Sequence, residues 1–210
     1  MRSTCLIAVP FPAARATIKG MTRALHLTQD EAADALLSDS WLALLIGMLL
    51  DQQIPMEQAF RGPRTLAERL GGLDAGSVVT TDPDVLAAAC AGPPAVHRFP
   101  GSMANRIRAL CGHLVAEHGG AVEQLWTAGE PDAREVLWRL RALPGFGEHK
   151  AQIFLALLGK QCGVRPTGWR EAAGRYGEDG VHRSIADVVD ARSLEQVRAD
   201  KKQAKAAAKR

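Results

Sequence analysis

The sequence is short of aromatic residues and has no stretch with the pattern of a β-strand. Aromatic residues make up only 5% of the 210 residues, and no run of alternating β-branched residues is long enough for a strand. The apolar residues are mostly Ala and Leu, which favour helices. With 47% hydrophobic residues, the chain can bury a core in one domain or in two closely joined lobes. We therefore predict an all-α fold.

The cysteines form no metal-binding pattern. Cys5, Cys90, Cys111 and Cys162 are far apart in the sequence, and none belongs to a CxxC pair. Zinc sites and iron–sulfur clusters need closely spaced ligands. We therefore expect reduced thiols, with no metal and no cofactor.

Long hydrophobic runs are missing as well. The longest, Trp41–Leu50, has about half of the roughly 20 residues that a membrane-spanning helix needs, so we expect a buried helix and no membrane partner. Residues 1–20 carry a short apolar patch that Pro10 and Pro12 interrupt. We expect these residues to form a disordered extension, with the functional part beginning near Met21. The expected location is cytoplasmic.

The formal net charge of +3 is mildly basic, which permits nucleic-acid binding without proving it. Much of the excess positive charge lies in the last ten residues, at Lys201, Lys202, Lys205, Lys209 and Arg210. A charged run at a terminus is typical of a solvated helix end. It therefore gives little evidence about function.

Helix start and stop signals divide the middle of the chain. Thr28 or Asp30 can cap a helix that runs through Leu37, and Asp39–Ser40 can cap a second helix, from Trp41 to Asp51 or beyond, that is apolar nearly all round. The second helix therefore belongs in the centre of the molecule. Further helices are expected at about residues 56–70, 82–90, 102–118, 132–140 and 151–159, and from Ser193 onward.

The most informative stretch is Leu143–Ala151, LPGFGEHKA, which separates two helical patterns. Pro144 cannot continue a helix, while Gly145 and Gly147 tolerate positive φ, so we predict a tight turn. The following amides begin a helix, where unsatisfied N–H groups and the helix dipole favour an anion. Lys150 would add positive charge beside them. A phosphate would fit there, although a PG turn is also typical of an ordinary helix connection.

Together with the following AQIFLALL helix, this stretch resembles the helix-hairpin-helix DNA glycosylase superfamily, the endonuclease III-like base-excision repair proteins. The resemblance covers about residues 35–190. It implies a partner, double-stranded DNA containing a damaged or mispaired base, and a nucleoid-associated place in the cell. It also implies that hairpin amides hold a DNA phosphate. The implied DNA-binding residues of the hairpin are Leu143, Gly145, Phe146, Gly147 and Lys150.

The resemblance further implies a two-lobed plan within a domain of residues 21–210. The hairpin at 143–147 would lie in a central lobe of about residues 52–160, and residues 21–51 would pack with 161–210 as a second lobe. The base to be removed would flip out of the duplex into the space between the lobes. Trp169 or Tyr176 would line this space, or would be ordinary core residues. We expect a monomer.

The segment Leu49–Gln53 is similar to the LL-x-x-Q segment of the family. The last glutamine of that segment fills the gap left by an extruded base, so the resemblance implies this role for Gln53. The alternative is a glutamine that simply caps the helix end. Arg98 and Arg106 fall where the family has a basic residue near DNA, although they are equally consistent with ordinary surface arginines.

Two features depart from the family. A catalytic aspartate is expected in the window Val164–Trp169, which contains no acid. The acidic residues that follow the window include Glu171, Asp179 and Asp187, and we take Glu171 and Asp187 as candidate catalytic residues.

The second departure concerns the lysine that forms a Schiff base in strand-cutting members. His149 stands at its position, and Lys150 is one residue further, turned by about 100° on the helix. This register predicts no lyase activity. His149 is the third catalytic candidate, because imidazole can polarise a base or position water near neutral pH.

The sequence thus predicts a base-excision repair protein that binds duplex DNA and hydrolyses an N-glycosidic bond, monofunctional if active. The alternative is a catalytically degenerate protein of the same fold that binds damaged DNA. A third interpretation is an all-α scaffold for protein partners. It differs from the other two in having no role with nucleic acid.

Overall fold

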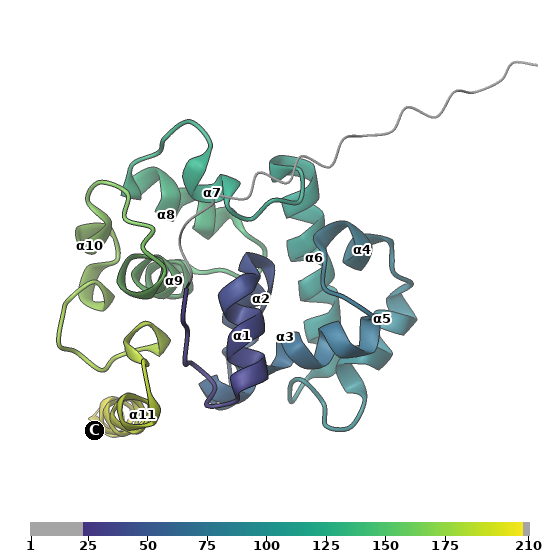
Figure 1. Ribbon diagram of the computed structural model, residues 1–210, viewed down its shortest axis with the longest axis horizontal. Helices are drawn as coiled ribbons and strands as arrows, with labels where there is room; N and C mark the ends of the chain where they lie inside the picture. The colour runs from purple at the N-terminus through teal and green to yellow at the C-terminus, as the bar shows by residue number, and fades with distance from the viewer. Residues whose placement is uncertain (1–22, 208–210) are drawn as a thin grey trace, which may run out of the picture.

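The computed structural model describes residues 23–207, and over this range the protein is built from helices without any strand (Figure 1). The predicted all-α fold is confirmed for these residues. The predicted N-terminal extension, residues 1–20, lies outside the described range, as does Cys5. The elements are α1 (Glu31–Asp39), α2 (Trp41–Leu50), α3 (Met56–Leu70), α4 (Ala75–Thr80), α5 (Pro83–Ala91), α6 (Pro100–His118), α7 (Gln124–Thr127), α8 (Ala133–Ala142), α9 (Glu148–Gln161), α10 (Trp169–Ala172), the 3-10 turns η1 (Gly174–Tyr176) and η2 (Ile185–Asp187), and α11 (Ala191–Ala207).

Helix α2 lies at the centre of the molecule, as its sequence predicts. The Ser40 side chain caps it by accepting a hydrogen bond from the Ala43 amide, and every residue from Leu42 to Leu50 is buried. Its neighbours are α1, α3, α6 and α9. Gly47 allows close packing, because a Cβ there would lie 2.6 Å from Cδ1 of Phe60 on α3. None of the described helices could cross a membrane alone, and the pair α1 and α2 meets the length and hydropathy criteria only with a bend of 117°.

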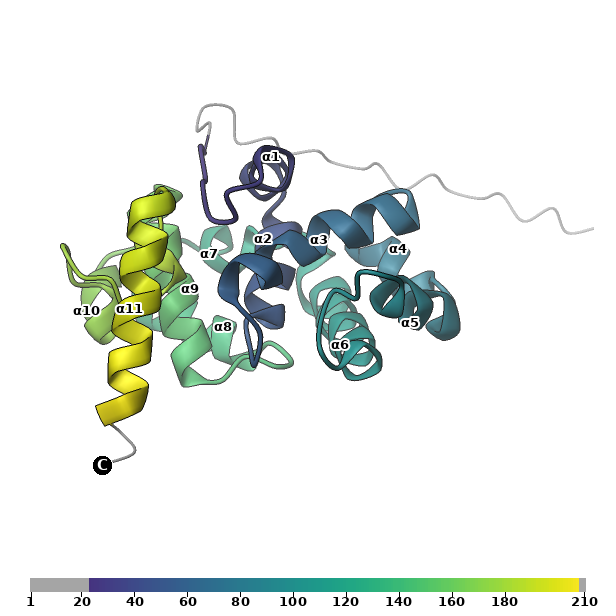
Figure 2. The same ribbon diagram turned by 90° about the horizontal axis from the view of Figure 1, so that it is seen from below.

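The other helices form two groups on either side of α1 and α2 (Figures 1 and 2). On one side α4 and α5 pack against α6, and α3 contacts α5. On the other side α8, α9 and α10 pack together, and η1 and η2 cover α9. The expected grouping put the hairpin in a lobe of residues 52–160. In the structure, the two helices of the hairpin make most of their contacts with the C-terminal elements.

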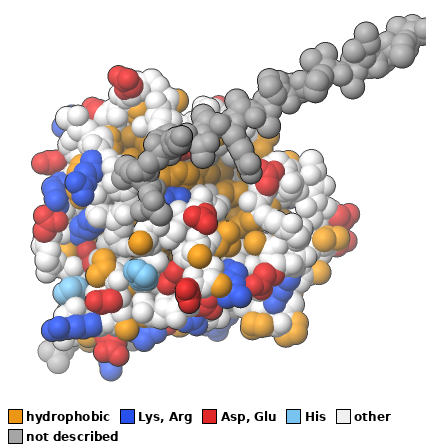
Figure 3. Space-filling model, in the orientation of Figure 1, with side chains coloured by type: hydrophobic (Ala, Val, Ile, Leu, Met, Phe, Trp, Pro, Cys, Tyr) orange, Lys and Arg blue, Asp and Glu red, His pale blue; other side chains and the backbone are white. Residues whose placement is uncertain are grey.

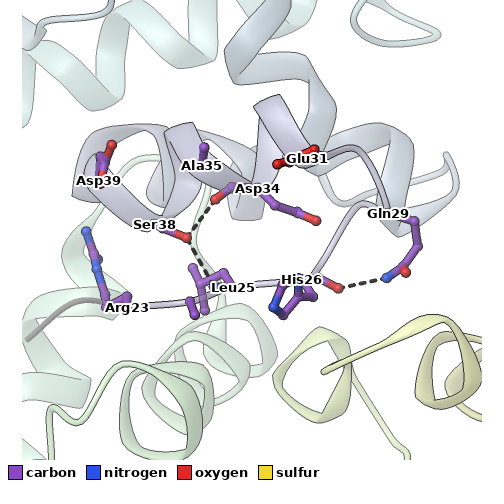
Figure 4. Close-up of a pocket in the computed structure, with 10 residues that line it drawn as sticks. Arg23, Leu25, His26, Gln29, Glu31, Asp34, Ala35, Ser38 and Asp39 are labelled. Atoms are coloured by element: carbon purple, nitrogen blue, oxygen red, sulfur yellow. Dashed lines mark hydrogen bonds between the residues drawn. The ribbon is translucent and has the colours of Figure 1, made fainter.

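The face that carries α1 contains a hollow of about 510 Å³ (Figure 4). Leu25, His26, Asp34 and Ser38 line part of it, and Ser38 links the Leu25 amide to the Asp34 carbonyl. Acidic and basic side chains are mixed around this face, with hydrophobic side chains near its middle (Figure 3). In Figure 2 α1 lies at the top, whereas the α2–α3 loop and the α8–α9 turn reach the lower edge.

Candidate nucleic-acid interface

The turn between α8 and α9 is anchored by its apolar residues. Leu143 and Phe146 are buried, the Phe146 ring meets Phe154 edge-on, and the Phe146 amide donates to the Leu143 carbonyl at 3.0 Å. Gly145 has φ +85°, and a Cβ on it would lie 2.5 Å from Cδ1 of Leu49. The turn therefore closes directly onto the C-terminal end of α2, and Leu143 and Phe146 hold it there.

The first amides of α9 are free. The Ala151 amide donates to the Gly147 carbonyl, and Gly147, the residue before the helix, has no side chain to act as a cap. Within the described chain, the amides of Gly147, Glu148, His149 and Lys150 donate no hydrogen bond. These N–H groups and the positive end of the helix dipole together suit an anion such as phosphate.

One negative charge sits close to these amides. The Glu148 carboxylate lies in the first turn of α9, where it forms an exposed ion pair with Arg141 of α8 at 2.9 Å. Because the pair is exposed, it is weak and easily rearranged. His149, the residue at the position of the family's lysine, is exposed in the same turn.

Lys150 points toward α2. Its Nζ donates to the carbonyl oxygens of Met48 at 2.9 Å and Leu49 at 2.6 Å, so it caps the C-terminal end of α2. Burial lowers the pKa of Lys150 from 10.5 to about 8, with Arg106 lowering it further and Asp51 opposing the shift. The sequence suggested a phosphate contact for Lys150. The structure instead engages its ammonium group within the protein.

The α2–α3 loop carries Gln53, which is exposed and has φ 58°, a conformation that residues other than glycine seldom adopt. The loop is held through the preceding residue. The His97 Nε2 lies 2.7 Å from the Gln52 carbonyl, and Arg106 donates to the Gln52 side-chain oxygen at 3.1 Å. Because His97 Nδ1 accepts from the Phe99 amide, Nε2 carries the ring proton and donates it to Gln52. Gln53 is therefore presented by a fixed loop.

Phe99 is a further residue of this face, which sequence reasoning missed. It directly precedes α6, 45% of its surface is exposed, and the Arg98 guanidinium lies 5.3 Å from its ring centre. An exposed aromatic ring beside an arginine is a common surface for stacking a base. The signal in the sequence was an aromatic residue between a basic residue and a proline, which is too common to single out.

Asp51, between α2 and Gln53, was also missed. Its carboxyl group is half-buried and makes no hydrogen bond or ion pair within the described residues. Burial raises the pKa of Asp51, and Glu57 of α3 raises it further, whereas Lys201 of α11 and Lys150 lower it. From the sequence alone Asp51 resembles an ordinary polar residue at a helix end.

The acids that the sequence suggested lie elsewhere. Asp187 is paired with Lys160 at 2.6 Å, and its other oxygen accepts from the amides of Arg183 and Ser184. Lys160 is about 18 Å along α9 from the hairpin, at 1.5 Å for each residue. Asp179 is exposed and paired with Arg170.

Glu171 is exposed on α10 and has no hydrogen bond or ion pair to the part of the chain that is described. The two aromatic candidates are core residues. Trp169 is buried where a Cβ on Gly159 would overlap its ring, and Tyr176 is buried with its hydroxyl oxygen accepting from Arg175. None of these residues joins the group formed by the hairpin and the α2–α3 loop.

Helix α11 completes this face. Arg198 pairs with Glu57 at the start of α3, and Lys201 Nζ lies 3.8 Å from the Met56 sulfur. The C-terminal half of α11 therefore lies beside the α2–α3 loop, and in Figure 2 it runs down to the same lower edge as the hairpin. Four elements thus meet around residues 51–53: the hairpin, the loop before α6, α3 and α11.

A model of the HhH-GPD superfamily, described as base excision DNA repair proteins, matches residues 46–210. The matched region includes the α2–α3 loop, the hairpin and α11. Searches of curated proteins and of solved structures found no match.

Proposed function

The chain belongs to the HhH-GPD superfamily of base excision DNA repair proteins, and from this we propose that it is a DNA glycosylase that removes a damaged or mispaired base from duplex DNA. The observation that carries the proposal is the meeting of two features on one face. Free amides at the start of α9 suit a phosphate, and the exposed Gln53 lies on the loop that follows α2, the helix whose end the same turn contacts.

Binding would begin at the hairpin. The amides from Gly147 to Lys150 would hold one phosphate of the backbone, and Arg98 and Lys201 lie on neighbouring elements of this face. Contacts of this kind position the duplex without reading its sequence. They also make affinity fall as salt rises, because bound cations are released from the DNA.

Base extrusion would follow. A glycosylase must take its target base out of the stack, which costs a few kcal/mol. Gln53 is exposed on its fixed loop and would fill the gap that the base leaves. Phe99 would stack on an adjacent base, and His149, exposed in the first turn of α9, would approach the sugar or the base.

We propose that the reaction is hydrolysis only, without strand cleavage. A strand-cutting enzyme of this type needs a neutral amine that can reach the sugar. Burial lowers the pKa of Lys150 to about 8, but its Nζ is held by two carbonyl oxygens at the end of α2 and is not free to reach the sugar. This anchoring supports the register argument from the sequence.

The alternative is a protein that binds damaged DNA without cutting a bond. The observation that favours it is the absence of any acid from the window 164–169, together with the ion pairing of Asp187 and Asp179 far from the hairpin. Such a protein would use the same face and would bind lesions with the same dependence on salt.

The experiment incubates the protein with duplexes that contain uracil, hypoxanthine, alkylated purines or oxidised bases, and then cleaves abasic sites with alkali. A glycosylase yields strand breaks only after alkali, and borohydride traps no covalent complex. Breaks without alkali, or trapping that is lost in Lys150→Met, would show lyase activity. Tight, salt-sensitive binding without any product would favour the damaged-DNA-binding protein.

A further inference from the structure

The most unusual group on the proposed DNA-binding face is the Asp51 carboxyl. It lies at the C-terminal end of α2, where the helix dipole disfavours a negative charge. It is half-buried and has no hydrogen-bond donor within the described residues. It directly precedes the fixed Gln52 and the exposed Gln53. A structural aspartate normally accepts hydrogen bonds, as Asp187 does from two amides and a lysine.

The charged groups around Asp51 come from several elements. Lys150 of α9, Lys201 of α11 and Glu57 of α3 are near enough to influence the charge of Asp51, and Arg106 of α6 influences that of Lys150. Burial raises the pKa of the carboxyl above the usual value, and the two lysines are close enough to stabilise its anion once a proton has left. These surroundings suit a group that gives up a proton and takes it back.

We propose that Asp51 is the catalytic acid of this protein and that its substrate is a base that is uncharged in DNA. This inference rests on the proposed glycosylase function and replaces the aspartate that is missing from residues 164–169. Without a proton, an uncharged base departs as an anion, which is a poor leaving group. A base that already carries a positive charge through alkylation needs no acid.

The proton that Asp51 gives up in the proposed reaction is replaced at the end. As the C1′–N bond breaks, its electrons leave with the base, and the Asp51 proton passes to the departing nitrogen. Positive charge develops on the sugar, beside the new carboxylate. Water then bonds to C1′, and its proton passes to Asp51, which restores the carboxyl group. One water is consumed, and a free base and an abasic site are produced.

The test compares wild type with Asp51→Asn, which keeps the shape of the side chain and cannot transfer the proton. Single-turnover excision and DNA affinity are measured separately on duplexes carrying hypoxanthine, uracil or 7-methylguanine. We expect excision of the uncharged base to fall about 100-fold or more, the range for loss of an acid, with unchanged affinity. Asp51→Ser gives a second neutral variant if Asp51→Asn does not fold. Asp84→Asn, at an exposed position on α5, is the matched control and should keep the wild-type rate.

The pH profile gives a second readout. The wild-type rate should fall as pH rises through the raised pKa of Asp51, and the residual rate of Asp51→Asn should lack that limb. Full activity of Asp51→Asn on an uncharged base would overturn the inference and leave the glycosylase function intact. A wild type that releases only 7-methylguanine would also overturn it. A wild type that releases no base would overturn the proposed function, and the role of Asp51 with it.

Discussion

At Gly145 the turn that we propose faces DNA leaves no room for a side chain. Its φ is +85°, and a Cβ would lie 2.5 Å from Leu49. Gly145→Ala should therefore lose about 1–2 kcal/mol of stability from the left-handed backbone alone, with weaker DNA binding because the amides move. Gly147→Ala is the control, since its φ is −90° and nothing lies within 4 Å. Urea unfolding measures both, and an equal loss in the two variants would contradict this picture of the turn.

Lys150 should make the free energy of unfolding rise with pH in the alkaline range. Its pKa is about 8 in the folded state against 10.5 as the ordinary value. Between these values the unfolded chain binds more protons, so stability should rise with pH, by up to about 3 kcal/mol for this group. This stability is lost as pH falls from 10.5 to 8, and below 8 both the folded and the unfolded chain bind the proton. Lys150→Met should lack this rise in urea unfolding between pH 7.5 and 10.5, and parallel curves for the two proteins would contradict the assignment.

The α2–α3 loop depends on one buried histidine from another element. His97 donates to Gln52 and accepts from the Phe99 amide, so His97→Phe leaves two partly buried backbone groups unpaired. We expect a loss of about 1–3 kcal/mol in stability and weaker discrimination of lesion DNA from intact DNA, because Gln53 is no longer held. His26→Phe, at an exposed site, should change neither. Thermal melting and competition binding would show whether both effects appear together.

Helices with strong end signals could be predicted from the sequence, and short ones could not. The range Met56–Leu70 agrees with the expectation of 56–70, and Ser40 caps α2 as expected. Helices α4 and α7 were missed, because six and four residues carry too little periodicity to show a buried face. The contacts of α9 with η1 and η2 could not be foreseen either, since packing partners depend on the whole fold.

The site was predictable only where it is local. The hairpin lies in one stretch, so its glycines and free amides follow from the sequence. Asp51, Phe99 and the anchoring of Lys150 depend on α2, α6, α9 and α11 coming together. The absence of lyase activity stays a prediction, and the partners of Lys150 on α2 could not be predicted from the sequence.

At the scale of the whole molecule, the dependence of DNA affinity on salt concentration should depend on the positive charges of the proposed face. Lys201 lies beside Met56 on this face, whereas Arg192 begins α11 about 13 Å further along the helix. Lys201→Gln should reduce the slope of log K against log salt by about 1, the value for one phosphate contact. Arg192→Gln should leave the slope unchanged. A reduction in both variants would indicate that α11 acts only through net charge.

The most direct measurement is the release of a base from lesion-containing duplexes by wild type and Gly145→Ala, scored by alkaline cleavage and by borohydride trapping. We predict that wild type releases a base, that strand breakage requires alkali, and that borohydride traps no complex. In Gly145→Ala, base release and DNA affinity should fall together. Base release that persists at the wild-type level in Gly145→Ala, with DNA affinity unchanged, would contradict the assignment of the hairpin and the α2–α3 loop as the working face.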